Sequence, residues 1–319
     1  MLLSRVAEAV YWTGRYLERA ESTARILKVH TELFLDLPKA AGIGWTPLLA
    51  ISGSESEFDE LYRHAYEEDV LCFLAADARN RSSIVSCLAQ ARENMRTTRA
   101  IFPRELWEAL NHLHLVTAET CEDAVPRRTR LRWLESLLAD TQRLTGTMAG
   151  AMIHDDAYSF LRLGRHIERA DMTTRVLDVG AATLTGGGDD LSPYADITWM
   201  SVLKSVSAYQ SYRRKVQSRV KGPDVLAFLL QDPQFPRSVE HCLIEVARCL
   251  AELPHHEAAT AVCAGAQAMV TEAKVKALAW DGLHEFVDDL QLELDRLHDH
   301  VITSYFRTDE TVPELLASA

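Results

Sequence analysis

The sequence contains little of what strands and tight turns require. Of its 319 residues, only 14 are glycine and 10 are proline. This scarcity leaves few turn signals and favours long helices. No segment shows a sustained alternation of apolar and polar residues bounded by hairpin turns. We therefore expect an all-α protein, a helical bundle.

The chain also lacks the cysteine spacings of redox and zinc sites. None of its six cysteines forms a Cys-x-x-Cys pair, and most lie in apolar helical contexts, where cysteine behaves as a small hydrophobic residue. We expect them to be reduced, in a cytoplasmic protein. They are Cys72, Cys87, Cys121, Cys242, Cys249 and Cys263.

Membranes and nucleic acids are not expected partners. No apolar run reaches the length of about 20 residues that spans a bilayer, and Arg5 and Glu8 come too early for a signal-peptide core. Lysine plus arginine number 34 and aspartate plus glutamate 46, a formal net charge of −12. That balance disfavours binding of a phosphate backbone as the main task.

Familiar catalytic and metal-binding motifs are missing as well. There is no Gly-x-Ser-x-Gly turn and no His-Glu-x-x-His helix. Glu252 stands three residues before His255, but Pro254 interrupts that helix. The glycines at 186–188 lack a following Lys-Ser/Thr and suit a loop better than a phosphate cradle. We expect no metal and no cofactor.

What the sequence does contain is a repeat. Residues 14–27 read GRYLERAESTARIL, and residues 164–177 read GRHIERADMTTRVL, with eight identical positions. Hydrophobic periodicity alone would not keep Arg, Glu and Arg in register. The charged residues are therefore the informative part of the repeat.

Further blocks recur in the same order, 150 to 155 residues later. Trp45 is echoed by Trp199, and the stretch from Asp69 to Asp77 by that from Asp224 to Asp232. Later matches join Ser83 to Ser238, Cys87 to Cys242 and Arg143-Leu144 to Arg296-Leu297. We interpret the chain as two pseudo-symmetric, duplicated helical halves, residues 1–150 and 151–306, followed by a C-terminal tail, 307–319.

Apolar residues at three- and four-residue steps predict the helices. The first helix has Ser4 as its expected N-cap. Further helices are predicted over 82–101, 131–149, 158–183, 196–220, 237–252, 257–278 and 282–305.

The repeated charges form one stripe on each copy of the motif, because residues three, four and seven apart share a helix face. The stripe lies opposite the apolar face, but neighbouring apolar residues predict partial burial. The first stripe holds Arg15, Glu18, Arg19 and Ser22, with Arg25 at its edge; the second holds Arg165, Glu168, Arg169 and Met172, with Arg175 at its edge.

Three interpretations of these stripes are open. Arg–Glu pairs on a surface helix contribute only about 0.2–0.5 kcal/mol each. A buried Arg–Glu network could instead fix how the two copies cross. In the third interpretation the six arginines bind a carboxylate or phosphate, and Glu18 and Glu168 are candidate catalytic groups that orient them or transfer a proton.

Two further sets of polar residues are weaker candidates. Arg92, Asn94 and Arg96 belong to a charged helix segment on which Arg92, Arg96 and Arg99 share a face, and we expect a structural or partner-facing role there. Asp77 and Asp232 stand where a helix ends. Capping is their expected role, although a matched pair of aspartates could also face a shared site.

The segments MLLSRVAEAVYWTGRYLERAESTARIL, ARENMR, ELWEALN and LGRHIERA together resemble the bacterial alpha-E domain family over essentially the whole chain. The resemblance implies an all-helical fold. It also implies an association with circularly permuted ATP-grasp ligases, beside or fused to which such domains are encoded. One departure is Met172, which stands where the first copy has Ser22.

The resemblance and the stripes lead to a functional expectation. The chain would be an accessory or substrate-handling component of an ATP-grasp-linked peptide or amino-acid ligation system, with an anionic peptide or amino acid held by the arginines. One alternative is a free-standing helical enzyme acting on a small anionic peptide. Another is a non-catalytic helical scaffold whose Arg/Glu stripes are internal salt bridges.

Overall fold

The structure is a computed structural model that describes residues 2–38, 43–186, 194–278 and 282–306. Within these ranges every regular element is a helix, which confirms the all-α prediction. None of the described helices is both long and apolar enough to cross a membrane. The predicted tail, 307–319, lies outside the described residues, as do 187 and 188 of the glycine-rich segment.

Two long helices, α1 (Ser4–Asp36) and α8 (Asp156–Gly186), occupy the centre of the molecule. Between them in sequence lie α2 (Thr46–Ser52), α3 (Glu55–Leu61), α4 (Glu67–Ala75), α5 (Ile84–Thr97), α6 (Arg104–Thr120) and α7 (Arg127–Ala151), with two short 3-10 turns at Arg99–Ile101 and Cys121–Ala124. After α8 follow α9 (Ala195–Ser205), α10 (Tyr209–Val216), α11 (Gly222–Gln231), α12 (Val239–Ala251), α13 (Glu257–Glu272), α14 (Val275–Leu278) and α15 (Leu283–Tyr305).

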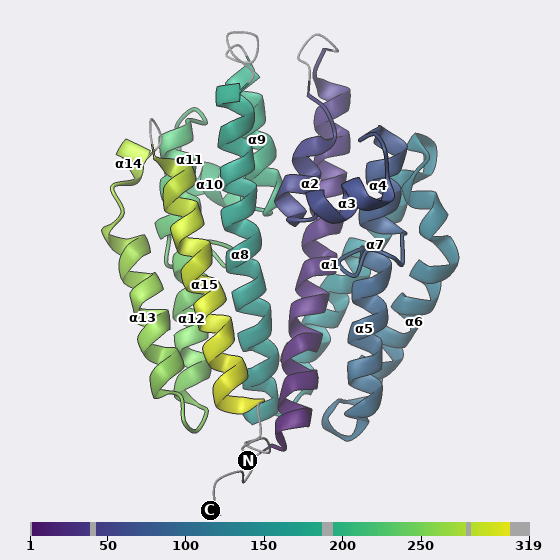
Figure 1. The fold of residues 1–319 in the computed structure, drawn as a ribbon, viewed down its shortest axis with the longest axis vertical. Coiled ribbons are helices and arrows are strands. Elements are labelled where there is room, and N and C mark those ends of the chain that lie inside the picture. The colour runs from purple at the N-terminus through teal and green to yellow at the C-terminus, as the bar shows by residue number, and fades with distance from the viewer. Residues whose placement is uncertain (1, 39–42, 187–193, 279–281, 307–319) are drawn as a thin grey trace, which may run out of the picture.

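The two central helices run side by side in the same direction (Figure 1). Helices α5 and α7 pack against α1, and α12 and α15 pack against α8. The segments that match in sequence thus make matching contacts. Ser83 and Ser238 likewise both act as N-caps, of α5 and α12, each accepting a hydrogen bond from a backbone N–H three residues on. Duplication and the boundary at residue 150 remain our interpretation of the repeat.

The central helices touch backbone to backbone at the two glycines of the repeat. A Cβ atom on Gly14 would lie 2.2 Å from the carbonyl oxygen of Leu161, and one on Gly164 would lie 2.2 Å from that of Tyr11. Only glycine permits so close an approach in mid-helix. The glycine that opens each motif therefore sets the distance across which the charged side chains meet.

Three of the predicted helices are interrupted. In the segment 82–101, α5 ends at Thr97 and a 3-10 turn follows at Arg99–Ile101. The segment 196–220 is not one helix: α9 ends at Ser205, and α10 begins at Tyr209. Ser207 between them has a φ of 55°, in the left-handed region that ends a helix. The segment 257–278 is likewise divided, between Glu272 and Val275.

One further prediction about the helices was wrong, and several helices were not predicted. Ser4 is the first residue of α1, not its cap; Leu3 takes the N-cap position and makes no side-chain capping bond. No range was predicted for α2, α3, α4, α6 or α11, although helix ends were expected at Asp77 and Asp232. The first two have only seven residues each, too few for a clear periodic pattern.

Candidate functional site

The stripe arginines of α1 bind the stripe glutamate of α8. Arg15 donates from Nε to Glu168 Oε2 at 2.6 Å. Arg19 donates from Nε to Oε1 at 2.5 Å and from Nη2 to Oε2 at 3.0 Å. Both carboxylate oxygens of Glu168 are therefore occupied by guanidinium groups from the neighbouring central helix.

The reciprocal contacts hold the stripe glutamate of α1. Arg165 donates from Nη2 to Glu18 Oε2 at 2.9 Å, and Arg169 donates from Nε to Oε1 at 2.7 Å and from Nη2 to Oε2 at 2.6 Å. Each glutamate is thus gripped by two arginines of the other helix. Such charge-assisted, bidentate contacts fix geometry as well as contribute energy.

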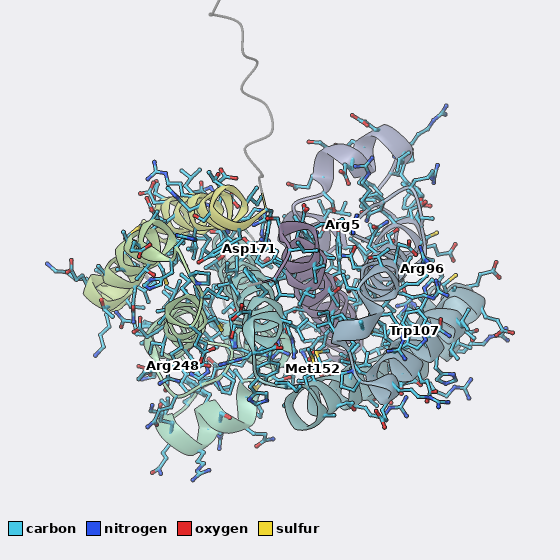
Figure 2. All side chains as sticks on the ribbon, turned by 90° about the horizontal axis from the view of Figure 1, so that it is seen from below. Arg5, Arg96, Trp107, Met152, Asp171 and Arg248 are labelled. Atoms are coloured by element: carbon cyan, nitrogen blue, oxygen red, sulfur yellow. The ribbon has the colours of Figure 1, made fainter. Side chains whose placement is uncertain are left out.

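These contacts form two clusters that share no residue. The Glu18 cluster comprises Glu18, Glu21, Arg25, Arg165, Arg169 and Arg237. The Glu168 cluster comprises Glu168, Arg15 and Arg19, together with the Asp171–Arg175 pair, whose carboxylate interacts electrostatically with Arg15 and Glu168. In Figure 2, Asp171 of the Glu168 cluster lies on the side of the central helices that carries α15. The two stripes therefore do not face one common site, because each stripe glutamate is bound by arginines of the other central helix.

Both stripe glutamates are buried and ionised. At most 1% of either side chain is exposed. Burial alone would raise their pKa values, but Arg169, Arg237 and Arg165 hold the pKa of Glu18 well below its usual range. Against the same burial, Arg19 and Arg15 lower the pKa of Glu168 to about 2.

These pKa shifts bear directly on the catalytic hypothesis. A general base works best with a pKa near the operating pH, and it must reach the proton that it removes. Glu18 and Glu168 have lowered pKa values, no exposed surface and oxygens already engaged by arginines. The geometry suits a buried ionic frame and does not suit proton transfer.

The two clusters differ by one arginine. Arg237, just before α12, donates from Nη1 to Glu18 Oε1 at 2.7 Å and from Nη2 to Glu21 Oε1 at 2.6 Å. The matching position in the first half is Ser82, whose hydroxyl accepts from Arg19 Nη1 at 3.3 Å. Four guanidinium groups therefore face two carboxylates in the Glu18 cluster, whereas three face two in the Glu168 cluster.

The arginines at the edges of the stripes pair within their own helices. Arg25 donates to Glu21 at 2.6 Å, and Arg175 donates to Asp171 at 2.9 Å. Burial and repulsion from Arg237 lower the pKa of Arg25, and its Nε is buried without a partner. Positive charge is thus incompletely balanced around Glu18.

The second charged segment divides into two parts. The guanidinium groups of Arg92 and Arg99 both lie over the ring of Trp107, 5.5 Å from its centroid. Arg96 is exposed and pairs with Glu93 at 2.6 Å (Figure 2). The expectation of a face shared by all three arginines is therefore wrong. Asn94 is half-buried, and its backbone carbonyl accepts from the Thr97 and Thr98 hydroxyls.

The matched aspartates order the turns that follow α4 and α11. Asp77 accepts from the backbone N–H of Arg79 at 2.9 Å, and Asp232 accepts from that of Gln234 at 2.9 Å. Their other partners differ: Arg79 and Tyr62 hold Asp77, whereas Lys215 holds Asp232. The two carboxylates are engaged separately, in local turns.

Three residues of the two clusters, Glu21, Asp171 and Arg237, were not predicted from the sequence. Glu21 and Asp171 lie inside the repeat, so their membership of the clusters could have been inferred from it. Arg237 could not, because its counterpart is Ser82 and the repeat therefore gives no signal there. Among the described residues, no three histidine, cysteine, aspartate or glutamate side chains are grouped so that they could hold a metal ion.

A Glu-Arg pair occurs twice in the sequence, at 18–19 and 168–169, and each pair contributes its glutamate to one cluster and its arginine to the other. A family model described as "a predicted alpha-helical domain with a conserved ER motif" matches residues 2–306. The chain belongs to the Alpha-E family.

Curated relatives of this Alpha-E chain are uncharacterised mycobacterial proteins. One from Mycobacterium bovis is 25% identical over 272 residues, and one from Mycobacterium tuberculosis H37Rv is 24% identical over 272 residues. In each case the match covers 78% of this chain and 30% of the relative. The chain thus corresponds to less than a third of these longer proteins. No solved structure matches it.

Proposed function

We propose that the chain is a non-catalytic accessory module of a peptide- or amino-acid-ligating system whose chemistry is performed by a circularly permuted ATP-grasp ligase. The observation that carries the non-catalytic part is the state of Glu18 and Glu168. Both are fully buried, ionised and enclosed by arginines. The Arg/Glu clusters serve to lock α1 and α8 together and so present a rigid helical body to the partner.

Two considerations favour a partner. The family resemblance implies association with such ligases, and the mycobacterial relatives continue well beyond the segment that matches this chain. A module that occurs inside longer proteins commonly works beside another domain. The free-standing enzyme is less well supported, because both candidate catalytic carboxylates are inaccessible.

The test uses the chain together with an ATP-grasp ligase from the same genome neighbourhood. The two proteins would be co-expressed and analysed by size-exclusion chromatography, and ATP turnover would be measured over a panel of amino acids with and without the chain. We expect a stable complex and an altered turnover or amino-acid preference. No complex together with unchanged turnover would refute the partnership; turnover of a peptide by the chain alone would support the enzyme instead.

A matched pair of variants tests the predicted partner-facing segment. Arg96 and Arg296 are both exposed, and each pairs with a glutamate three residues earlier on its helix. If the α5 surface contacts the ligase, Arg96→Glu weakens the complex and Arg296→Glu does not. Equal effects of the two substitutions would remove α5 from the interface.

A further inference from the structure

A cleft about 200 Å³ in volume lies between the C-terminal part of α7 and the N-terminal part of α8, beside the Glu18 cluster. Its polar lining comes from Thr145, Tyr158, Arg162, Arg165, His166 and Arg169. Three guanidinium groups thus reach one cleft from successive turns of α8. The carboxylates next to it, Glu18 and Glu245, are already bound by these arginines.

Several polar atoms at this cleft have no hydrogen-bond partner among the described residues. Arg165 turns its Nε and Nη2 edge to Glu18, which leaves Nη1 without a hydrogen bond. Arg162 bonds to Glu245 through Nη2 alone. The Nδ1 atom of His166 is buried and unpartnered. Buried polar atoms are normally satisfied, so such a group calls for an explanation.

The matching place in the other half shows what satisfies these donors there. Arg15 is the counterpart of Arg165, and its Nη1 donates to the hydroxyl of Tyr11 at 3.3 Å. Tyr11 in turn bonds to His298 Nδ1 at 2.7 Å. At the cleft, Leu161 stands in the position of Tyr11, and Thr145 stands in the position of His298. The side chain of Leu161 has no oxygen that could accept a hydrogen bond from Arg165.

Aromatic rings also cover the counterpart place. Trp12 and Tyr16 stack on each other, with ring centroids 5.4 Å apart. At the cleft the matching residues are Arg162 and His166. In the first half these rings are half-buried, and the Arg15 guanidinium lies 5.6 Å from the centroid of the Trp12 ring. In the second half cationic and polar groups line an open cleft instead.

We propose that this α7–α8 cleft binds an oxyanion, a phosphate or carboxylate group of a small ligand, whose oxygens take the place that the Tyr11 hydroxyl occupies in the other half. Arg162 and Arg165 supply the free donors, and the excess positive charge of the Glu18 cluster favours the anion. Arginine is suited to this role because its planar donor set matches both groups. The site is built within this chain and does not depend on the proposed ligase partner.

The test is isothermal titration calorimetry on the purified chain at low ionic strength, with inorganic phosphate and with succinate as probes. We expect one site for at least one of the two probes, and the tighter probe distinguishes a phosphate from a carboxylate ligand. Arg162→Gln should weaken binding about tenfold or more, since it removes a charge-assisted donor. Arg143→Gln, an exposed arginine on α7, should change it less than about twofold.

A second variant introduces at the cleft the residues that occupy the matching positions in the first half. Leu161→Tyr combined with Thr145→His places a hydroxyl and an imidazole where Tyr11 and His298 lie in the counterpart. Binding of the probe should be lost while the circular dichroism melt stays cooperative. If this variant does not fold, Arg162→Gln decides. The proposal is overturned if neither probe binds the wild-type chain, or if binding survives Arg162→Gln at the level of Arg143→Gln.

Discussion

The Glu18 and Glu168 clusters have one layout and different surroundings. In both, a buried glutamate is gripped by two arginines of the opposite central helix. Around Glu18 there is an added arginine and an open cleft; around Glu168 there are a serine and packed aromatic rings. The part common to both clusters, here called the frame, is one glutamate and the two arginines that bind it. Because this part is the same in both halves, the residues around it can differ and can have other functions.

The largest expected difference between the clusters comes from neutralising each glutamate. Glu18→Gln leaves four buried or half-buried arginines facing a single carboxylate, that of Glu21, and should destabilise the fold by about 3–5 kcal/mol. Glu168→Gln should cost less, because Arg19 has 23% of its side chain exposed and water can solvate it. Urea denaturation of both variants measures this difference.

The control for that pair is Glu108→Gln, which removes an exposed partner of Arg104 and should change stability by less than about 1 kcal/mol. Equal losses for Glu18→Gln and Glu168→Gln would mean that the extra arginines around Glu18 carry no energetic weight.

Acid should weaken the frame through the same glutamates. The pKa of Glu168 in the folded chain is about 2, below the value of about 4.3 expected when unfolded. A lowered carboxyl pKa stabilises the fold above the unfolded pKa, and this contribution is lost as the pH falls. We expect Glu168 to account for a loss on the order of 3 kcal/mol between about pH 5 and pH 2.

Buried histidines also make the fold less stable in acid, and their effect begins at a higher pH than that of Glu168. Burial is the main cause that lowers the pKa values of His30 and His298 to about 4. Their stabilising contribution is complete above about pH 6.5 and declines as the pH falls toward 4. Urea midpoints measured from pH 7 to pH 3 would show both phases. In Glu168→Gln the phase below pH 5 should be smaller; an unchanged profile would contradict the assignment.

The sequence allowed the frame to be predicted in part. Eight matched positions in one helical motif indicated that charged side chains are presented twice, and flanking apolar residues indicated burial. Helix periodicity gave the long elements. It did not predict how the two central helices pack against each other. Arg15 binds Glu168 rather than Glu18 because the two parallel helices are in contact at Gly14 and Gly164. A single helix pattern contains no information about which neighbour a side chain will meet.

The cleft was beyond the sequence for a different reason. The repeat draws attention to positions that match, whereas the cleft depends on positions that differ. Arg162 and His166 stand where the first half has Trp12 and Tyr16, and Arg237 stands where it has Ser82. Such departures acquire meaning only after the matching residues have been placed in space.

Backbone contact between the central helices gives a symmetric test. Gly14→Ala and Gly164→Ala each place a Cβ atom 2.2 Å from a carbonyl oxygen of the other helix. The helices must separate, and overpacking of this kind typically costs about 1–3 kcal/mol. Because the two contacts are alike, we expect similar losses in urea denaturation. Gly146→Ala on α7 meets nothing within 4 Å and should leave stability unchanged or raise it. A large loss from only one of the central glycines would contradict the equivalence.

The substitution with the smallest expected effect makes the Glu18 cluster resemble the Glu168 cluster. Arg237→Ser gives the Glu18 cluster the residue that the Glu168 cluster has at that place. It removes two hydrogen bonds to carboxylates, but it also relieves the repulsion that lowers the pKa of Arg25. Since Arg165 and Arg169 still hold Glu18, we expect a net loss of roughly 1–2 kcal/mol in urea denaturation.

Ser82→Ala, which removes only a 3.3 Å hydrogen bond from Arg19, is the matched control and should cost less. A loss as large as that of Glu18→Gln would show that the third arginine belongs to the frame itself, and the division between a shared frame and a specialised half would then have to be redrawn.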